Sequence, residues 1–195
     1  MTNQALFRRL KVSRNKILLM LLLFLSGAMN ILLSAKVNSQ KHELVSAREW
    51  GFGVGRTAQP LRAHNLNGVP ASVPLTGDVM PTVVYVYSPQ CIWSSRNIDN
   101  INTLIRETKG KYKFVGLALS DASLDQYILK NNLSIPTFKM PDKCSKGDLR
   151  VVGTPQTIVL SKKGQILKNW YGAYSGSLKT EVENYFGLTL PGTIR

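Results

Sequence analysis

A run of nineteen uncharged residues near the start, Ile17 to Ala35, constrains this chain more than any other feature. At about 1.5 Å per residue, a helix of that length spans roughly 28 Å, close to the hydrocarbon thickness of a bilayer, about 30 Å. No acidic residue occurs among residues 1–35, and five positive side chains precede the run: Arg8, Arg9, Lys11, Arg14 and Lys16. The positive-inside rule therefore predicts a cytoplasmic basic tail over residues 1–16 and a transmembrane signal anchor over residues 17–35.

A cleaved signal peptide is the alternative interpretation of the same run. Leu25-Ser-Gly-Ala28 offers small residues after an apolar core, as a cleavage site requires. The apolar run resumes at Ile31 and continues to Leu33, which favours a retained anchor over cleavage or a buried core helix. We therefore expect a single-pass inner-membrane protein whose amino end is cytoplasmic and whose carboxyl-terminal domain is periplasmic or otherwise extracytoplasmic.

Composition limits the classes of partner and cofactor. Lys and Arg outnumber Asp and Glu by 25 to 11, a net charge of +14, but the basic residues form no block of the type that binds nucleic acid. We expect a solvated basic face that is weakly attracted to membrane phosphates, and no nucleic-acid partner. The two cysteines are too few for a disulfide scaffold, and with His42 and His64 they form no metal set, so no metal or other cofactor is predicted.

The exported part divides into a flexible stalk over residues 36–59 and a folded domain over residues 60–190. The stalk prediction rests on mixed polar composition and on three closely spaced glycines, Gly51, Gly53 and Gly55. In the domain, apolar periodicity and turn residues predict nine segments in order. These are a hairpin over 61–75 that turns at Asn67-Gly68, a strand over 82–87, a helix from 92 to about 109, a strand over 112–119, a helix over 123–131 capped by Ser123, an irregular segment over 135–152, strands over 156–160 and 166–171, and a helix over 177–186. This order is typical of one three-layer α/β/α domain.

Cys91 stands where the strand over 82–87 runs into a helix. Unpaired N–H groups and the positive end of the helix dipole stabilise a thiolate there, and the thiolate is the nucleophile in disulfide exchange. The Ser94 hydroxyl, three residues further on, is within reach of the sulfur and can donate to it. Pro155 precedes the next apolar strand, over 156–160.

These segments resemble the thioredoxin-like superfamily, in particular the membrane-tethered exported redoxins of the TlpA/ResA type. The resemblance is carried by Ser88-Pro-Gln-Cys91-Ile-Trp-Ser94, by Gly153-Thr-Pro155-Gln-Thr-Ile-Val, by Lys163-Gly164-Gln-Ile and by Gly172. It implies a thioredoxin-like fold with a cis peptide bond before Pro155, beside Cys91. It also implies that Trp93, Thr154 and Pro155 bind the substrate, with the Thr154 backbone pairing with an extended thiol substrate.

The chain departs from that family at two positions. The second cysteine is replaced by Ser94, and the residue six before the nucleophile, often a buried carboxylate in thioredoxins, is Tyr85. Serine cannot resolve a mixed disulfide, so Cys91 needs a separate thiol to release its partner. Cys144 is a possible resolving thiol if its Cα approaches that of Cys91 within about 7 Å, and otherwise it is a structural thiol.

The leading prediction is thiol–disulfide exchange through a single active-site cysteine, Cys91, whose thiolate Ser94 tunes. Its partners would be protein or small-molecule thiols and disulfides. Three alternatives stay open: a redox-inactive thioredoxin-fold binding module of an exported assembly, a basic membrane-surface protein, and a peroxiredoxin-like thiol peroxidase. The last is suggested by Ser88, three residues before Cys91, because it imitates the hydroxyl-x-x-Cys pattern of peroxiredoxins.

Overall fold

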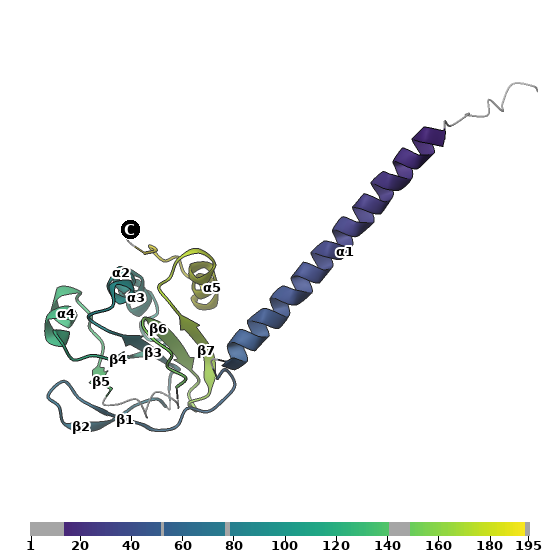
Figure 1. Cartoon of the computed structure of the whole chain (residues 1–195). Helices are drawn as coiled ribbons and strands as arrows, with labels where there is room; N and C mark the ends of the chain where they lie inside the picture. Colours follow the sequence, from purple (N-terminus) through teal and green to yellow (C-terminus); the bar gives the residue numbers. More distant parts are fainter. Residues whose placement is uncertain (1–13, 52, 77–78, 141–148, 194–195) are drawn as a thin grey trace, which may run out of the picture. The chain divides into compact units, whose positions relative to one another are not determined.

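A computed structural model describes residues 14–51, 53–76, 79–140 and 149–193 (Figure 1). The chain divides after Ala47 into two compact units, and each is described by itself.

The first unit is dominated by one long helix, α1 (Arg14–Gly51). Its segment Lys16–Gln40 has a mean hydropathy of 2.3 and no buried share, so by length and composition it can cross a membrane. This agrees with the predicted amino-terminal apolar helix. The helix does not end at Ala35, however, but continues through residues 36–51, where a flexible stalk was predicted. Those residues contain no proline, and no glycine before Gly51, so nothing in the backbone interrupts the helix.

The rest of the predicted stalk is attached to the folded unit. Gly55 N–H donates to the carbonyl of Ile166 at 2.8 Å, and Ala58 N–H donates to that of Gly164 at 2.9 Å. Thr57 forms an isolated bridge with Gln165 between these two bonds. Residues 55–58 therefore lie along the edge of the last strand instead of forming a free linker.

The second unit is built on a seven-stranded mixed sheet in the order β2-β1-β5-β4-β3-β6-β7 (Figure 1). The central strands β3, β4 and β5 are parallel, and the other pairs are antiparallel. The strands are β1 (Leu61–His64), β2 (Pro70–Val73), β3 (Thr82–Tyr87), β4 (Lys113–Ala118), β5 (Thr137–Lys139), β6 (Gln156–Leu160) and β7 (Ile166–Tyr171). The predicted hairpin over 61–75 is present as β1 and β2, with Gly68 at φ 79° in its turn.

In the described part of this unit, four helices accompany the sheet: α2 (Ile92–Arg96), α3 (Ile98–Glu107), α4 (Leu124–Lys130) and α5 (Gly176–Phe186). Side chains of β3 alternate between two apolar clusters, because successive residues of a strand point to opposite faces. Val83, Tyr85 and Tyr87 join the cluster that contains buried residues of α3, α4 and α5. Val84 and Val86 join the opposite cluster, which the described residues cover with β1, β2 and the segment before β6.

Three predicted details differ from the structure. The single helix from 92 to about 109 is interrupted at Asn97, whose buried amide oxygen accepts hydrogen bonds from Asn100 Nδ2 and the Tyr174 N–H, both at 2.9 Å. Ser123 does precede α4, but its side chain makes no capping hydrogen bond, and its φ is 58°. In addition, β5 lies within the segment that was predicted to be irregular.

Candidate thiol site

Cys91 follows β3 and immediately precedes α2, as the sequence predicts. Its N–H donates to the carbonyl of Ser88 at 3.0 Å, which closes the turn after the strand. Its own carbonyl accepts from the N–H groups of Ser94 at 3.0 Å and Ser95 at 3.2 Å, and these bonds start the helix. The side chain is half-buried, so the sulfur is held by the backbone on both sides and still borders solvent.

The segment before β6 lies against this sulfur. Cys91 Sγ is 3.3 Å from the carbonyl oxygen of Thr154, to which the protonated thiol donates. The Thr154–Pro155 peptide bond is cis, as the resemblance implies. The structure thus brings together Cys91, Thr154 and Pro155, which are far apart in the sequence.

The environment of Cys91 favours its ionised form. Burial acts in the opposite direction and is the largest single influence, because desolvation penalises a thiolate. Hydrogen bonds from the Thr154 side chain, from the Ser94 N–H and hydroxyl, and from the Trp93 N–H together outweigh it and lower the pKa of the thiol. The neutral thiol donates to the Thr154 carbonyl, and this bond is lost when the thiol ionises. The thiolate then accepts hydrogen bonds from Thr154, Ser94 and Trp93.

Ser94 is fully buried under the Cys91 turn. Its hydroxyl oxygen accepts from the Ser88 N–H at 3.4 Å, and its carbonyl accepts from the Tyr85 hydroxyl at 3.4 Å. Tyr85 and Ser94, the two positions that depart from the family pattern, are therefore in contact. Sequence reasoning identified both residues but not this bond.

Tyr85 cannot take the place of a buried carboxylate base. Burial, and then the neighbouring Tyr127 and Tyr174, raise its pKa well above the ordinary value. The phenol therefore stays protonated throughout the physiological range and acts only as a hydrogen-bond donor. The arrangement can stabilise one thiolate, but Tyr85 offers no general base for a second thiol.

Exposed apolar side chains flank Cys91 and the Thr154 segment along the chain. Ile92 and Trp93 follow Cys91, Val152 lies two residues before Thr154, and each of the three is more than half exposed. Tyr171 packs its ring against Gly153, where an added β carbon would approach it to 2.9 Å. The Arg96 guanidinium lies 5.1 Å from the centre of the Trp93 ring, which adds a cation to the same rim.

Gln156 organises the Thr154 segment, and sequence reasoning missed it. Its fully buried amide accepts from the Val152 N–H at 3.0 Å and donates to the Arg150 carbonyl at 3.0 Å and to Asn169 Oδ1 at 2.6 Å. A glutamine that opens an otherwise apolar strand was the available signal, because buried amides are kept only where they are hydrogen-bonded.

We expect Gln156→Met to lower the free energy of unfolding by about 2–3 kcal/mol, because it removes the buried hydrogen bond to Asn169 and the part-buried ones to the Val152 and Arg150 backbone. Urea unfolding followed by tryptophan fluorescence measures this change. Gln165→Met removes an exposed amide of the same type and should have little effect. Equal stability of the two variants would contradict the structural role of Gln156.

We also expect Ser94→Ala to raise the pKa of Cys91, because it deletes a donor to the thiolate. In a Cys144→Ser background, alkylation by iodoacetamide near pH 7 should slow by roughly two- to tenfold, since one pKa unit changes the thiolate fraction about tenfold. The rates should converge at a pH above both pKa values. Ser95→Ala is the matched control, and an unchanged pH profile for Ser94→Ala would show that the hydroxyl does not tune the sulfur.

Cys144, the possible resolving thiol, lies outside the described residues. Among the residues that the structure describes, Cys91 is a free thiol. Two other predicted site residues differ in their exposure to solvent. Ser94 is buried beside the sulfur, whereas Trp93 is half exposed on the rim.

Comparison with known proteins gives matches at the level of structure. No protein-family model and no curated protein matches the sequence. Many solved structures are similar, and three of them illustrate the match. The thioredoxin domain of a thiol-disulfide oxidoreductase from Bacteroides vulgatus has a TM-score of 0.56 at 16% identity, with 68% of this chain and 97% of that chain covered. StoA from Bacillus subtilis has a TM-score of 0.51 at 16% identity, with 69% and 98% covered. A DsbF homologue from Corynebacterium diphtheriae has a TM-score of 0.54 at 17% identity, with 68% and 86% covered. The folded unit of this chain therefore has the thioredoxin-like fold.

Proposed function

We propose that this chain is a membrane-anchored protein that carries out thiol–disulfide exchange through a single cysteine, Cys91. The observation that carries the proposal is the hydrogen-bonded environment of that sulfur, which lowers its pKa although it is partly buried. A thiolate that borders solvent is the form that attacks disulfides. Proteins of the same fold that are named thiol-disulfide oxidoreductases add support.

The substrate would dock on the rim around the sulfur. Among the described residues, the Thr154 N–H has no hydrogen-bond partner, so it is available to an extended peptide. Ile92, Trp93 and Val152 offer exposed apolar surface on either side. A cysteine-containing segment with apolar neighbours fits this surface better than a highly charged one.

The anchor would be α1, with the folded unit outside the cytoplasm. The apolar length of Lys16–Gln40 and the positive residues that precede it support this orientation. Protease treatment of intact spheroplasts tests the orientation. We expect the folded unit to be digested, and protection of that unit would contradict an exported domain.

The central experiment is thiol trapping of the full chain in detergent micelles. With hydroxyethyl disulfide in excess, Cys144→Ser should gain one adduct on Cys91 near neutral pH, as read from the intact mass. The variant Cys91→Ser with Cys144 intact is the matched control, and it should react far more slowly at this pH. Absence of an adduct on Cys91 would refute the exchange function.

A redox-silent binding module is the second candidate, and the apolar rim together with the buried Ser94 favours it. If the chain is a binding module, the Cys91→Ser variant should still bind its partner. If it is an exchange protein, the same variant should be inactive because it lacks the sulfur. A peroxidase receives less support. The Ser88 hydroxyl oxygen accepts from the Gln90 N–H at 3.3 Å, and no hydrogen bond joins it to the sulfur among the described residues.

A further inference from the structure

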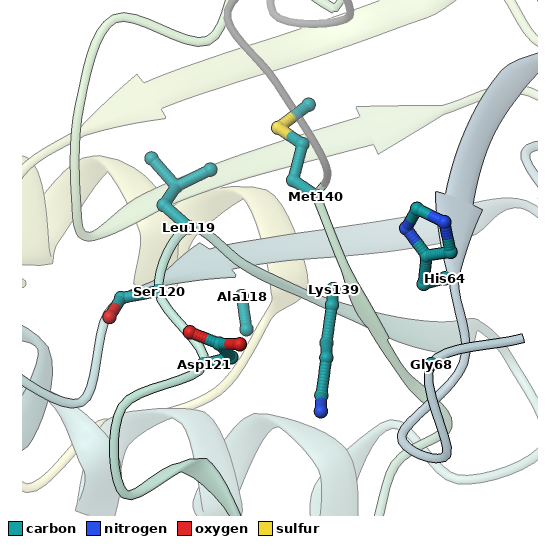
Figure 2. Close-up of a pocket in the computed structure, with 8 residues that line it drawn as sticks. All are labelled: His64, Gly68, Ala118, Leu119, Ser120, Asp121, Lys139 and Met140. Atoms are coloured by element: carbon teal, nitrogen blue, oxygen red, sulfur yellow. The ribbon is translucent and has the colours of Figure 1, made fainter.

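A cavity of about 560 Å³ opens at the carboxyl ends of β4 and β5, next to the β1–β2 hairpin (Figure 2). Among the described residues, three ionisable side chains from three different segments line it: His64 ends β1, Asp121 lies in the loop after β4, and Lys139 ends β5. Leu119 and Met140 supply an apolar part of the wall. The cavity is thus apolar in part, with charged groups at separate points of its lining.

The positive and negative groups of this cavity do not neutralise each other. In the described parts of the chain, Lys139 makes no ion pair with an acidic side chain, and Asp121 makes none with a basic one. Figure 2 shows the Lys139 side chain extending into the space between Asp121 and the hairpin that carries His64. A ligand that carries both a carboxylate and an ammonium group would complement this arrangement.

The cavity adjoins the loop that holds the reactive sulfur. The Ser120 hydroxyl, on the cavity wall, donates to the side-chain oxygen of Gln90 at 3.2 Å, and Gln90 directly precedes Cys91. The Leu119 N–H donates to the carbonyl of Tyr87 at 2.9 Å, so the ends of β3 and β4 meet at this edge. An extended molecule of three residues covers roughly 10 Å, enough to run from the cavity toward the neighbouring loop.

We infer that this cavity binds the amino-acid head of a low-molecular-weight thiol, of the cysteine or glutathione type, and delivers its sulfur to Cys91. The carboxylate of the head faces Lys139 and His64, and its ammonium group faces Asp121. The inference rests on the proposed exchange function, and it names the external thiol that a site without a second cysteine requires.

The reaction balances with two molecules of this thiol. The first ligand thiolate attacks Cys91 Sγ in the mixed disulfide, a ligand–Cys91 disulfide forms, and the substrate leaves as a thiolate that takes a proton from solvent. The second ligand thiolate attacks the ligand sulfur of that disulfide and releases Cys91 as its thiolate. One substrate disulfide has then been reduced by two electrons, and two ligand thiols have been oxidised to one ligand disulfide.

The test measures release of the hydroxyethyl adduct from Cys91 by three thiols: glutathione, cysteine and neutral 2-mercaptoethanol. The full chain is used in micelles and in a Cys144→Ser background, and each rate is divided by the rate of the same thiol on a free cysteine adduct. We expect glutathione or cysteine to exceed 2-mercaptoethanol in this corrected rate. Lys139→Met and Asp121→Asn should each reduce that ratio about two- to fivefold, the effect of one solvent-accessible charge pair.

The matched control is Lys109→Met, which removes an exposed lysine from the turn after α3 and should leave the ratio unchanged. A corrected ratio near one, or one that Lys139→Met does not alter, overturns the inference but leaves exchange at Cys91 standing. Failure of Cys91 to form any adduct refutes the exchange function, and the inference falls with it. Acceleration by only one of the two zwitterionic thiols identifies which one the cavity accepts.

A binding measurement gives a readout that needs no exchange. S-Methylglutathione and S-methylcysteine have no free thiol, so their titration into the Cys91→Ser variant reports occupancy of the cavity alone. Binding that Lys139→Met weakens about two- to fivefold supports the inference. Lack of binding by both compounds contradicts it.

Discussion

Ser94→Cys is expected to convert this chain into a two-thiol protein that forms an internal disulfide with Cys91. Residues three apart at a helix start have Cα atoms about 5 Å apart, inside the range of roughly 4.4–6.8 Å that a disulfide needs. The buried side chain at position 94 already lies within hydrogen-bonding reach of the sulfur. In a Cys144→Ser background and an oxidising buffer, the intact mass should fall by that of two hydrogen atoms.

The same variant should release mixed disulfides without an external thiol. Intramolecular attack replaces a bimolecular step, so release at millimolar external thiol should accelerate by at least about 100-fold. Tyr85 remains protonated and cannot act as the base, so we expect this gain to increase as the pH rises. Ser161→Cys is the control, because Ser161 follows the far end of β6, roughly 17–20 Å from Pro155. If Ser94→Cys shows no internal disulfide, the packing derived for Cys91 and Ser94 is wrong.

The second large effect is expected at Gly116, in the middle of β4. A β carbon there would lie 2.6 Å from Thr137 Oγ1 on β5 and 3.3 Å from the Tyr87 ring on β3. Gly116→Ala must therefore displace the Thr137 hydroxyl, which hydrogen-bonds to Tyr87 and Ile135, or shift β5, and we expect a loss of about 1–3 kcal/mol in the free energy of unfolding. Gly116→Val should cost more, because it adds two methyl groups at the same point.

A double-mutant cycle tests the cause. Thr137→Ala removes the clashing hydroxyl, so the double variant with Gly116→Ala should be more stable than additive effects predict, by about 1 kcal/mol or more. Thr137→Ser keeps the hydroxyl and should give no such rescue. Additivity in both cycles would show that the contact between positions 116 and 137 is not the reason why position 116 requires glycine.

The elements nearest the sulfur could be predicted from the sequence because local patterns determine them. A buried apolar strand ends just before Ser88-Pro89, and a helix with apolar periodicity follows. Cys91 lies between them and is therefore placed at the start of the helix. The Asn67-Gly68 hairpin turn and the Gly164 turn are equally local, because each needs a residue that tolerates positive φ.

The features that could not be predicted depend on tertiary contacts. The break at Asn97 exists because its amide oxygen also accepts from Tyr174, far along the chain. The three-residue strand β5 has too few residues for a periodic pattern, and its parallel pairing with β4 defines it. The charged cavity likewise depends on pairing, since the backbones of His64 and Ala118 both lie opposite Lys139.

Residues 36–51 are helical for a local reason, in contrast to the flexible stalk that polar composition predicts. The Lys, Gln, Glu, Ala and Arg residues of this segment are polar or small, but all are good helix formers. The absence of glycine and proline before Gly51 was the better signal. Helix propensity therefore outweighs polarity in this segment, which continues an apolar helix.

The buried hydroxyl at position 94 has a kinetic consequence for any covalent partner of Cys91. As long as Cys144 takes no part, the protein holds no internal means to break that adduct. Its lifetime is then governed by the supply of reductant in the surrounding compartment and ranges from seconds to hours. Such a chain would keep a covalently bound partner where reductant is scarce and release it where reductant is abundant.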